Sequence, residues 1–281
     1  MKLGFAGLGR MGRPMAANLI AAAFEVTLWN RSPDKAVGLG VAVADSPRAL
    51  SDSADVIVTM LADDAASETV HFGPDGLFAG GASVFLEMGT VSPDHIAALA
   101  RATDAQVIDA PVSGSTPQAE TGTLKIMVGA NEDEIAPLRP VLDAMGDKID
   151  VMGGQGQAAV MKLAVNMLIH AMNQTLAEAL ALTDAAGLDR ERAFDVIAGS
   201  AAGAPMLGYR RGLYLDETAH DVTFALSLAR KDLDIATALA DRLGVAMPQA
   251  QVNRHRLAEA ESHGFGDRDM AAIVPHERGE R

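Results

Sequence analysis

The sequence contains no cysteine, which excludes disulfide bonds, thiolate metal sites and cysteine nucleophiles. Positive charge is also scarce, because 23 Lys and Arg residues stand against 37 Asp and Glu residues, for a formal net charge of −14. Non-specific binding to nucleic acid or to an acidic membrane requires a basic surface, so this balance argues against both. An anionic ligand would need a local positive pocket.

Long apolar runs and metal-ligand clusters are lacking too. The best candidate for a membrane span is interrupted by Lys162, Asn166, His170 and Asn173, so no span is expected. No group of His, Asp and Glu shows ligand spacing, so we expect no bound metal. The first predicted strand follows Met1 almost at once and leaves no room for a targeting segment, which favours a cytoplasmic location.

What the chain does have is enough length and apolar content for two domains. It has 281 residues, of which 49% are hydrophobic. Apolar stretches at 56–60, 83–86 and 106–109 alternate with helical patterns at 65–70 and 95–102. This rhythm is typical of a doubly wound parallel sheet with helices on both faces, an α/β fold.

The next segments extend this pattern and then abandon it. Two strands, Lys125 to Val128 and Ile149 to Met152, flank a predicted helix from Glu132 to Met145, and we expect them to complete the edge of the sheet. After residue 156 only helical periodicity remains. The predicted helices are Gln157 to Ala186, Arg190 to Ile197, Thr223 to Leu243 and Pro248 to His263. The polar end, 274–281, is expected to fray.

The start of the chain carries the most specific motif. The strand Leu3 to Ala6 runs into Gly7-Leu8-Gly9-Arg10-Met11-Gly12 and then into a helical pattern. This order suits a dinucleotide: the first glycine permits a tight turn, the second lets backbone N–H groups approach the pyrophosphate, and the third allows close helix packing. The alternative is an ordinary glycine turn. We therefore predict an N-terminal Rossmann-type domain, 1–157, followed by an all-α C-terminal domain, 158–281, with a substrate cleft at their junction.

The end of the second predicted strand indicates which dinucleotide is bound. There the chain reads Asn30-Arg31-Ser32 and lacks the carboxylate that would bind a ribose 2′-hydroxyl and repel a 2′-phosphate. Arg31 offers a planar fork of donors and Ser32 a hydroxyl. We predict that NADP(H) is preferred and that NAD(H) is possible, because Asp34 lies close by. The alternative is a solvated arginine beside a turn.

Lys162 and Asn166 interrupt an apolar helical pattern at i and i+4, so both project from one face. A buried ammonium needs partners, and burial lowers its pKa toward the range of proton exchange near neutrality. Lys162 is thus a candidate general acid and base, with Asn166 orienting the substrate. The alternative is a lysine whose stem covers the core while its head reaches solvent. His170, on the same stripe, is either a proton relay or a core histidine.

Two further segments are candidates for substrate binding. In the run 109–115, Ser113, Gly114 and Ser115 would place hydroxyls and consecutive N–H groups near a strand end, where they can hold a carboxylate. The alternative is a plain turn. Later, Lys231 and Asp232 lie inside a predicted helix and either face the cleft or belong to a solvated charge run.

Taken in order, these segments resemble the motifs of the β-hydroxyacid dehydrogenase family, which includes 3-hydroxyisobutyrate dehydrogenases, tartronate semialdehyde reductases and plant-type glyoxylate/succinic semialdehyde reductases. The likeness covers nearly the whole chain. Its motifs are Gly7 to Gly12 with Met15-Ala16-Ala17-Asn18-Leu19, Asp109 to Gly114, the segment from Gly153 and Gly156 to Lys162 and Asn166, and Lys231-Asp232-Leu233. Two departures, Ser115 in place of a second glycine and Gly89-Thr90 in place of a Ser-Thr pair, leave the substrate open.

The resemblance implies a role for each matched residue. Lys162 would be catalytic, Asn166 and Ser113-Gly114 would bind substrate, and Lys231 would lie near nicotinamide and substrate. Met60 and Leu61 would line the adenosine side and Thr90 would contact the nicotinamide ribose. Such proteins form dimers or tetramers through the helical domain.

The expected activity is reversible hydride transfer between NADP(H) and a short 3-hydroxy acid or the matching semialdehyde. One alternative is a glyoxylate or succinic semialdehyde reductase. Imine reductases share the architecture but have Asp or Tyr in place of the lysine. An alternative of another class is a non-catalytic NADP(H)-binding sensor.

Overall fold

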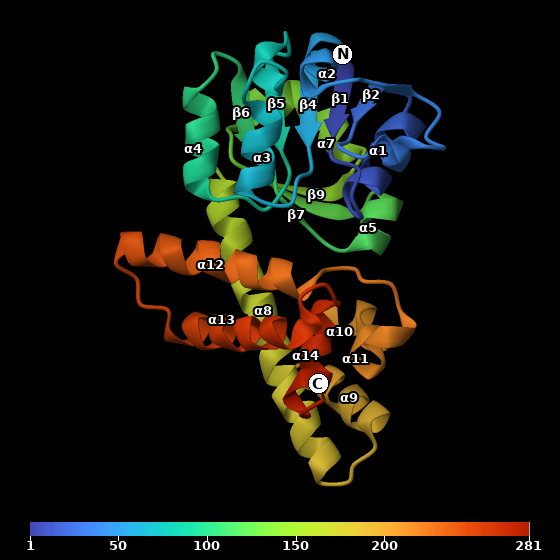
Figure 1. The fold of residues 1–281 in the computed structure, drawn as a ribbon, viewed down its shortest axis with the longest axis vertical. Helices are drawn as coiled ribbons and strands as arrows, with labels where there is room; N and C mark the ends of the chain where they lie inside the picture. The colour runs from blue at the N-terminus through green and yellow to red at the C-terminus, as the bar shows by residue number, and fades with distance from the viewer. Residues whose placement is uncertain (281) are drawn as a thin grey trace. The chain divides into compact units, whose positions relative to one another are not determined.

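The computed structural model describes residues 1–280, and their contacts divide the chain into two units, Met1–Lys162 and Leu163–Arg281. The first unit contains a six-stranded sheet in the order β3-β2-β1-β4-β5-β6, with every neighbouring pair parallel (Figure 1). The strands are β1 (Lys2–Ala6), β2 (Glu25–Trp29), β3 (Ala42–Val43), β4 (Val56–Thr59), β5 (Val84–Glu87) and β6 (Gln106–Asp109). The predicted doubly wound parallel sheet is confirmed, and its strand order reverses between β1 and β4.

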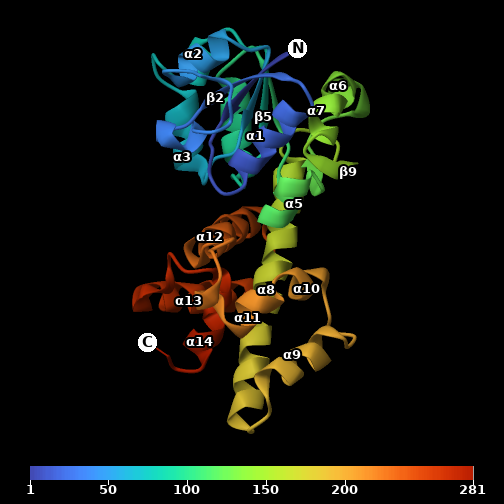
Figure 2. The ribbon, with the colours of Figure 1, turned by 90° about the vertical axis from the view of Figure 1, so that its right-hand side faces the viewer.

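Helices cover both faces of this sheet because its strands are apolar on both sides. On β4, Val56 and Val58 join the core that contains α1, whereas Ile57 joins the core on the opposite face. Seen nearly edge-on, the sheet has α2 and α3 on one side and α1 and α7 on the other (Figure 2). These helices are α1 (Gly12–Ala21), α2 (Pro47–Asp52), α3 (Asp64–His71), α4 (Pro93–Arg101) and α7 (Arg139–Asp143).

The prediction that the later strands complete the edge of the sheet is wrong. β7 (Val112–Ser113), β8 (Leu124–Val128) and β9 (Gly146–Val151) form a separate three-stranded sheet in which β7 runs antiparallel to β8. On β8, Leu124, Ile126 and Val128 are buried in the same core as α1 and β1, while Lys125 is exposed. The small sheet adjoins the end of β6, where the Gly129 N–H donates to the Asp109 carbonyl oxygen at 2.8 Å, but its strands do not pair with those of the large sheet.

The prediction of one continuous helix from Glu132 to Met145 is also wrong. The segment consists of α6 (Glu132–Ile135), a 3₁₀ turn (Ala136–Leu138) and α7. Pro137 and Pro140 lack the backbone N–H of a continuous helix and clash with the preceding turn, so the chain changes direction there.

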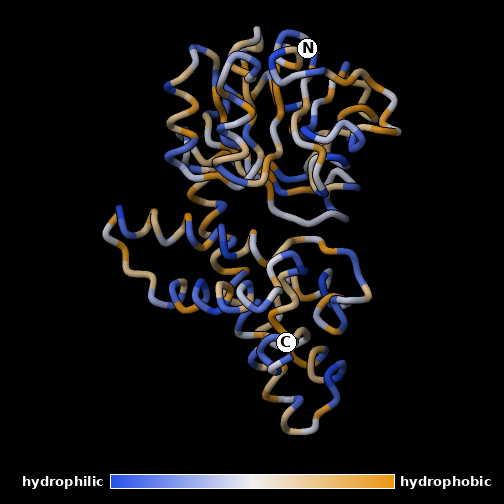
Figure 3. Tube along the Cα trace, viewed as in Figure 1, coloured by the Kyte–Doolittle hydropathy of each residue, from blue (hydrophilic) through white to orange (hydrophobic). Residues whose placement is uncertain are grey.

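The second half is helical, as predicted, and the described part of it contains only one isolated β-bridge, between Ala225 and Asp269. On α12 a buried stripe of small and apolar residues faces the core of the second unit. Along this helix hydrophobic and hydrophilic residues alternate, as the colours of Figure 3 show. No helix of the described chain combines the length and apolarity needed to cross a bilayer. The helices are α8 (Gln157–Ala185), α9 (Arg190–Ala198), α10 (Pro205–Tyr209), α11 (Arg211–Leu215), α12 (Leu226–Leu243), α13 (Pro248–Ala260) and α14 (Ile273–Glu277).

Of the segment 274–281 that was expected to fray, residues 274–277 are instead ordered in α14, and Arg281 lies outside the described residues. Ile273 and Val274 are almost completely buried in the core of the second unit, and His276 is also buried. Burial of this apolar pair outweighs the polar composition of the segment.

Candidate active site

The parallel register brings the predicted cofactor residues to one edge of the large sheet. Ala6 pairs with Trp29 on one side and Thr59 on the other, and Thr59 pairs with Glu87, so these four strand ends lie in one row. The segments that follow them are Gly7–Gly12, Asn30–Ser32, Met60–Leu61 and Met88–Thr90. They leave the sheet at its carboxyl edge, where doubly wound folds bind their ligands.

Each glycine of the first turn has a different reason for lacking a side chain. Gly7 has φ +100°, and a Cβ there would lie 2.4 Å from the Met60 carbonyl oxygen. A Cβ on Gly12 would lie 1.9 Å from the Gly7 carbonyl oxygen. A Cβ on Gly9 would meet nothing within 4 Å. The fold therefore requires glycine at positions 7 and 12, whereas Gly9 borders open space into which a ligand can come close to the backbone.

The helix that follows this turn begins without a side-chain cap. Met11 occupies the N-cap position and makes no capping hydrogen bond, and the first turn of α1 contains no acidic residue. The Arg13 N–H donates to the Gly9 carbonyl oxygen at 3.1 Å and Pro14 has no N–H, so an anion here would meet the N–H groups that precede Arg13 and the positive end of the helix dipole. Arg10 is exposed beside this start.

Asn30 ties the end of β2 to the glycine turn. Its Oδ1 accepts a 2.8 Å hydrogen bond from the Leu8 backbone N–H, and its Nδ2 donates a 2.9 Å hydrogen bond to the Ser32 carbonyl oxygen. Leu8 itself is buried, so its side chain belongs to the core. The side chains of Arg31 and Ser32 are exposed next to this linkage. The Asn30 amide thus fixes the shape of the loop, and the exposed hydrogen-bond donors beside it belong to Arg31 and Ser32.

Asp109, at the end of β6, holds the start of α8. Its carboxylate accepts 2.8 Å hydrogen bonds from the backbone N–H groups of Gly156 and Ala159. A Cβ on Gly129 would lie 2.1 Å from Asp109 Oδ1, so glycine there makes room for the carboxylate. Burial raises the pKa of Asp109, and the backbone hydrogen bonds oppose this shift. This capping role was missed, because the hydrogen-bonded partners are 47 and 50 residues away in the sequence.

The predicted substrate loop lies between β7 and α5 (Thr116–Thr121). Gly114 has φ +138°, and a Cβ there would lie 2.8 Å from a Leu124 methyl carbon, so the turn requires glycine. The Ser115 N–H and hydroxyl both donate 2.9 Å hydrogen bonds to Gln118 Oε1. Ser115 is therefore engaged at the start of α5. Ser113 ends β7 and is partly exposed.

Lys162 and Asn166 lie one turn apart on α8, as predicted, and both are buried, with exposed fractions of 9% and 4%. Asn166 Nδ2 donates a 2.5 Å hydrogen bond to Asp232 Oδ2, which links α8 to α12 within the second unit. The same carboxylate lies 2.9 Å from Lys231 Nζ and 3.6 Å from His170 Nε2. Asp232 is therefore the centre of a polar cluster, a connection that helical spacing alone does not reveal.

A parallel sheet with its strand-order reversal at a three-glycine turn, followed by an uncapped helix start, defines a dinucleotide-binding protein. Comparison with known proteins supports dinucleotide binding and identifies the family. Residues 2–154 match the family model described as the NAD binding domain of 6-phosphogluconate dehydrogenase, and residues 154–276 match the family model described as NAD-binding of NADP-dependent 3-hydroxyisobutyrate dehydrogenase. The chain belongs to the β-hydroxyacid dehydrogenase family.

Individual relatives support the same assignment. The chain is 33% identical to 3-hydroxyisobutyrate dehydrogenase of Pseudomonas aeruginosa, over 99% of this chain and 98% of the relative. It is also 33% identical to glyoxylate/succinic semialdehyde reductase 2 of Arabidopsis thaliana, over 98% and 78%. A structure of Mycobacterium tuberculosis 3-hydroxyisobutyrate dehydrogenase with L-serine matches with a TM-score of 0.84 and 29% identity, covering 99% of each chain. The protein is an NAD(P)-dependent hydroxyacid dehydrogenase that acts on a small molecule.

Proposed function

We propose that the protein transfers hydride between NADP(H) and a short 3-hydroxy acid or its semialdehyde, with Lys162 as general acid and base. The observation that carries this proposal is the pair Lys162 and Asn166, buried one turn apart on a helix whose start is fixed by Asp109. A buried ammonium is costly and is retained where its charge is used.

The cofactor residues fit a dinucleotide. The turn Gly7, Leu8, Gly9, Arg10, Met11 and Gly12 would hold the pyrophosphate through the backbone N–H groups after Leu8 and the start of α1, because the N–H groups of Gly7 and Leu8 already bind Trp29 and Asn30. Met60 and Leu61 would line the adenosine side, and Thr90 and Lys231 would lie near the nicotinamide and its ribose. When bound, the nicotinamide would give or take the hydride. Residues 1–157 form the proposed NADP-binding domain, and residues 158–281 form the proposed helical domain.

Lys162 would move the proton. During reduction its ammonium would donate a proton to the carbonyl oxygen as that oxygen becomes an alkoxide, and during oxidation the neutral amine would take the proton back. The positive charge would also stabilise the developing oxyanion in a site from which water is excluded. Both effects require the buried position that Lys162 occupies.

The substrate carboxylate would be bound by Ser113 and Gly114, with Asn166 and Lys231 on the helical side. Ser115 and Asp232 would act mainly by orientation. The Ser115 hydroxyl is used at the start of α5, and the Asp232 carboxylate already binds Asn166 and Lys231. The 33% identity to a plant glyoxylate/succinic semialdehyde reductase favours a second candidate that differs only in substrate length.

The preference for NADP(H) rests on the end of β2. Asn30 is uncharged and committed to the loop backbone, so no carboxylate would face a 2′-phosphate, while Arg31 and Ser32 remain exposed beside it. We also propose a homodimer or homotetramer assembled through the helical domain.

The test is a comparison of wild type with Lys162→Ala and Lys162→Arg. NADPH loss is followed against glyoxylate, succinic semialdehyde, methylmalonate semialdehyde and tartronate semialdehyde. We expect Lys162→Ala to lower the single-turnover rate by about 10²- to 10⁴-fold while NADPH binding is kept. Lys162→Arg keeps the charge and should retain part of the rate. A near-native rate in Lys162→Ala would remove the proposed role, and NADPH binding without turnover of any substrate would favour the sensor.

A further inference from the structure

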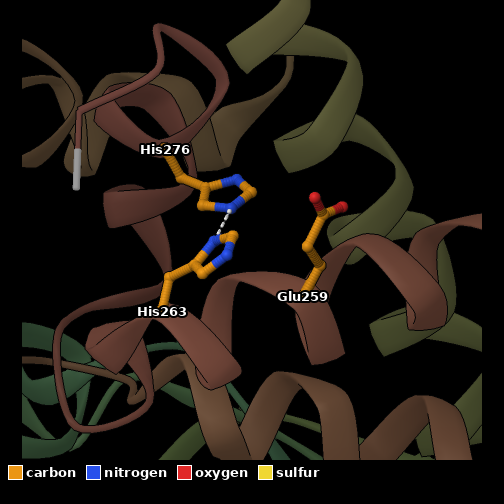
Figure 4. A group of neighbouring side chains, drawn as sticks. All are labelled: Glu259, His263 and His276. Carbon is orange, nitrogen blue, oxygen red and sulfur yellow. Dashed lines mark hydrogen bonds between the residues drawn. The ribbon is translucent and has the colours of Figure 1, made fainter.

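Three side chains with metal-binding atoms meet in the second unit, among residues that have no assigned part in the dehydrogenase reaction. Glu259, His263 and His276 each offer one ligand atom, and these atoms lie within 4.8 Å of one another. The two imidazoles face each other, and the Glu259 carboxylate lies beside them (Figure 4). His263 Nδ1 and His276 Nε2 share a 3.2 Å hydrogen bond, and a bound metal ion would take the place of its proton.

The local fold explains why these residues converge. Glu259 and His263 are four residues apart, at the end of α13 and in the π-helical turn Glu261–Phe265 that follows it. Beyond this turn the chain returns as α14, which brings His276 opposite His263 although 13 residues separate them. The Phe265 ring meets the His276 ring edge-on, with 5.5 Å between centroids, and fixes its plane.

The nitrogen separation suits a shared metal ion. Zinc binds histidine nitrogen at about 2.0–2.1 Å in tetrahedral geometry, which places two ligand atoms roughly 3.3 Å apart. The observed 3.2 Å is close to that value. Two histidines and one carboxylate are a common zinc ligand set that leaves a fourth position for water. His263 is exposed and His276 is buried, so an ion can enter from the side of His263.

The neighbouring charges also favour a cation. Glu259 Oε2 accepts a hydrogen bond from Arg256, which orients the carboxylate. His276 Nδ1 has no hydrogen-bond partner among the described residues and lies 3.7 Å from Glu277 Oε1. Metal-bound histidines usually direct their second ring nitrogen toward a carboxylate; Glu277 Oε1 is the nearby carboxylate oxygen, although it accepts hydrogen bonds from Arg256 and Gln174 and would have to move closer to take that role. Two carboxylates against one guanidinium leave the cluster with net negative charge.

We propose that Glu259, His263 and His276 bind one divalent transition-metal ion, Zn²⁺ being the probe of choice, with water in the fourth position. Imidazole and carboxylate ligands, without thiolate, suit zinc and its neighbours nickel and copper. The ion would fasten α14 to the end of α13 and so stabilise the second unit. It has no part in hydride transfer.

The experiment uses the full chain, freed of any histidine tag and of metal, titrated with ZnCl₂ at pH 7.5. We expect calorimetry to show one zinc ion per chain. Thermal unfolding should shift upward by about 5 °C at roughly 100 times the dissociation constant, because an ion that binds only the folded state stabilises it.

The variants identify the ligands. His263→Ala changes an exposed side chain, so the fold should persist, and we expect it to lose both the stoichiometric binding and the thermal shift. His276→Gln should behave in the same way. His255→Ala, which changes an exposed histidine on α13 outside the cluster, should keep both. Equal zinc binding by wild type and His263→Ala, or no saturable binding by wild type, would overturn the proposal. Dehydrogenase turnover should be equal in wild type and His263→Ala, which separates this test from that of Lys162.

Discussion

At the scale of single residues, Gly9 and Gly12 belong to one turn but need glycine for opposite reasons. Gly9 borders open space, whereas Gly12 abuts the Gly7 carbonyl oxygen. We predict that Gly9→Ala leaves the free energy of unfolding nearly unchanged and weakens NADPH binding by about tenfold or more, because a methyl group would occupy ligand space. Gly12→Ala should lower the free energy of unfolding by about 1–3 kcal/mol through overpacking.

Urea unfolding and NADPH fluorescence titration measure the two quantities on the same samples. The prediction fails if Gly9→Ala binds NADPH like wild type or if Gly12→Ala unfolds at the wild-type urea concentration.

Substitutions of Asn30 can test the shape and the charge of the cofactor loop independently. Asn30→Asp keeps an oxygen to accept the Leu8 N–H and adds a negative charge beside the expected 2′-phosphate. We predict that the preference for NADP(H) over NAD(H) falls by roughly 10- to 100-fold, since two like charges a few ångströms apart repel by about 1–4 kcal/mol. Steady-state kinetics with both cofactors give the ratio.

Asn30→Ala is the matched control, because it removes the hydrogen bond to Leu8 without adding charge. Both cofactors should then weaken together and the ratio should hold. An unchanged ratio in Asn30→Asp would contradict the proposed site for the 2′-phosphate.

The residue types at these positions could be read from the sequence, but their partners could not. The missing carboxylate at Asn30 is visible in the chain, whereas its hydrogen bond to Leu8 depends on how β1 and β2 pair. In the same way Ser115 carries the hydroxyl expected of a substrate ligand, and only the start of α5 shows that Gln118 accepts it.

At the scale of elements, α8 depends on a residue from another part of the chain. Asp109 accepts two backbone N–H groups at the start of α8, and Lys162 follows within the next turn. In Asp109→Asn the side-chain NH₂ group would face one of these backbone N–H groups, so one hydrogen bond would be replaced by two opposed donors. We predict a loss of about 1–3 kcal/mol in the free energy of unfolding at neutral pH, because a buried N–H would be left unsatisfied.

The pH dependence of this loss has a definite sign. Burial raises the pKa of Asp109 above its ordinary value of 3.8, so the folded state binds more protons than the unfolded state between 3.8 and the raised pKa. The contribution of Asp109 to stability is therefore greatest at low pH, falls as the pH rises through this window and is constant above it. Urea unfolding of wild type and Asp109→Asn between about pH 4 and pH 8 gives the difference. A difference that grows with pH would contradict the prediction.

Periodicity predicted the elements of the second half well and those between 110 and 150 poorly. The long helices begin at Gln157, Arg190 and Pro248 as predicted, since each has a continuous helical pattern. An apolar strand such as β8 has the same pattern whether it pairs with the large sheet or belongs to a second one, so the separate three-stranded sheet was not predictable from local pattern.

At the scale of the whole molecule, the α/β half and the helical half were predictable because strand signals cease after residue 156. The cluster of Glu259, His263 and His276 was not. It depends on the return of the chain as α14, most of which belongs to the polar segment that was expected to fray. The apolar pair that holds α14 in place acts through contacts distant in sequence.

Exposed apolar residues on α8 bear on the assembly. Met161, Leu168 and Leu182 lie at multiples of seven residues along the helix, hence on one face, with exposed fractions of 41%, 59% and 71%. Apolar groups so arranged usually face a partner, and the proposed homo-oligomer supplies one. We predict that Leu168→Glu combined with Leu182→Glu lowers the sedimenting mass to that of a single 29.2 kDa chain, because paired charges cannot be buried at such an interface. Val37→Glu, an equally exposed change in the first unit, should leave the mass of the wild-type assembly unaltered. A wild-type protein that sediments as one chain at micromolar concentration, or a double variant with the wild-type mass, would show that this face of α8 joins no second copy.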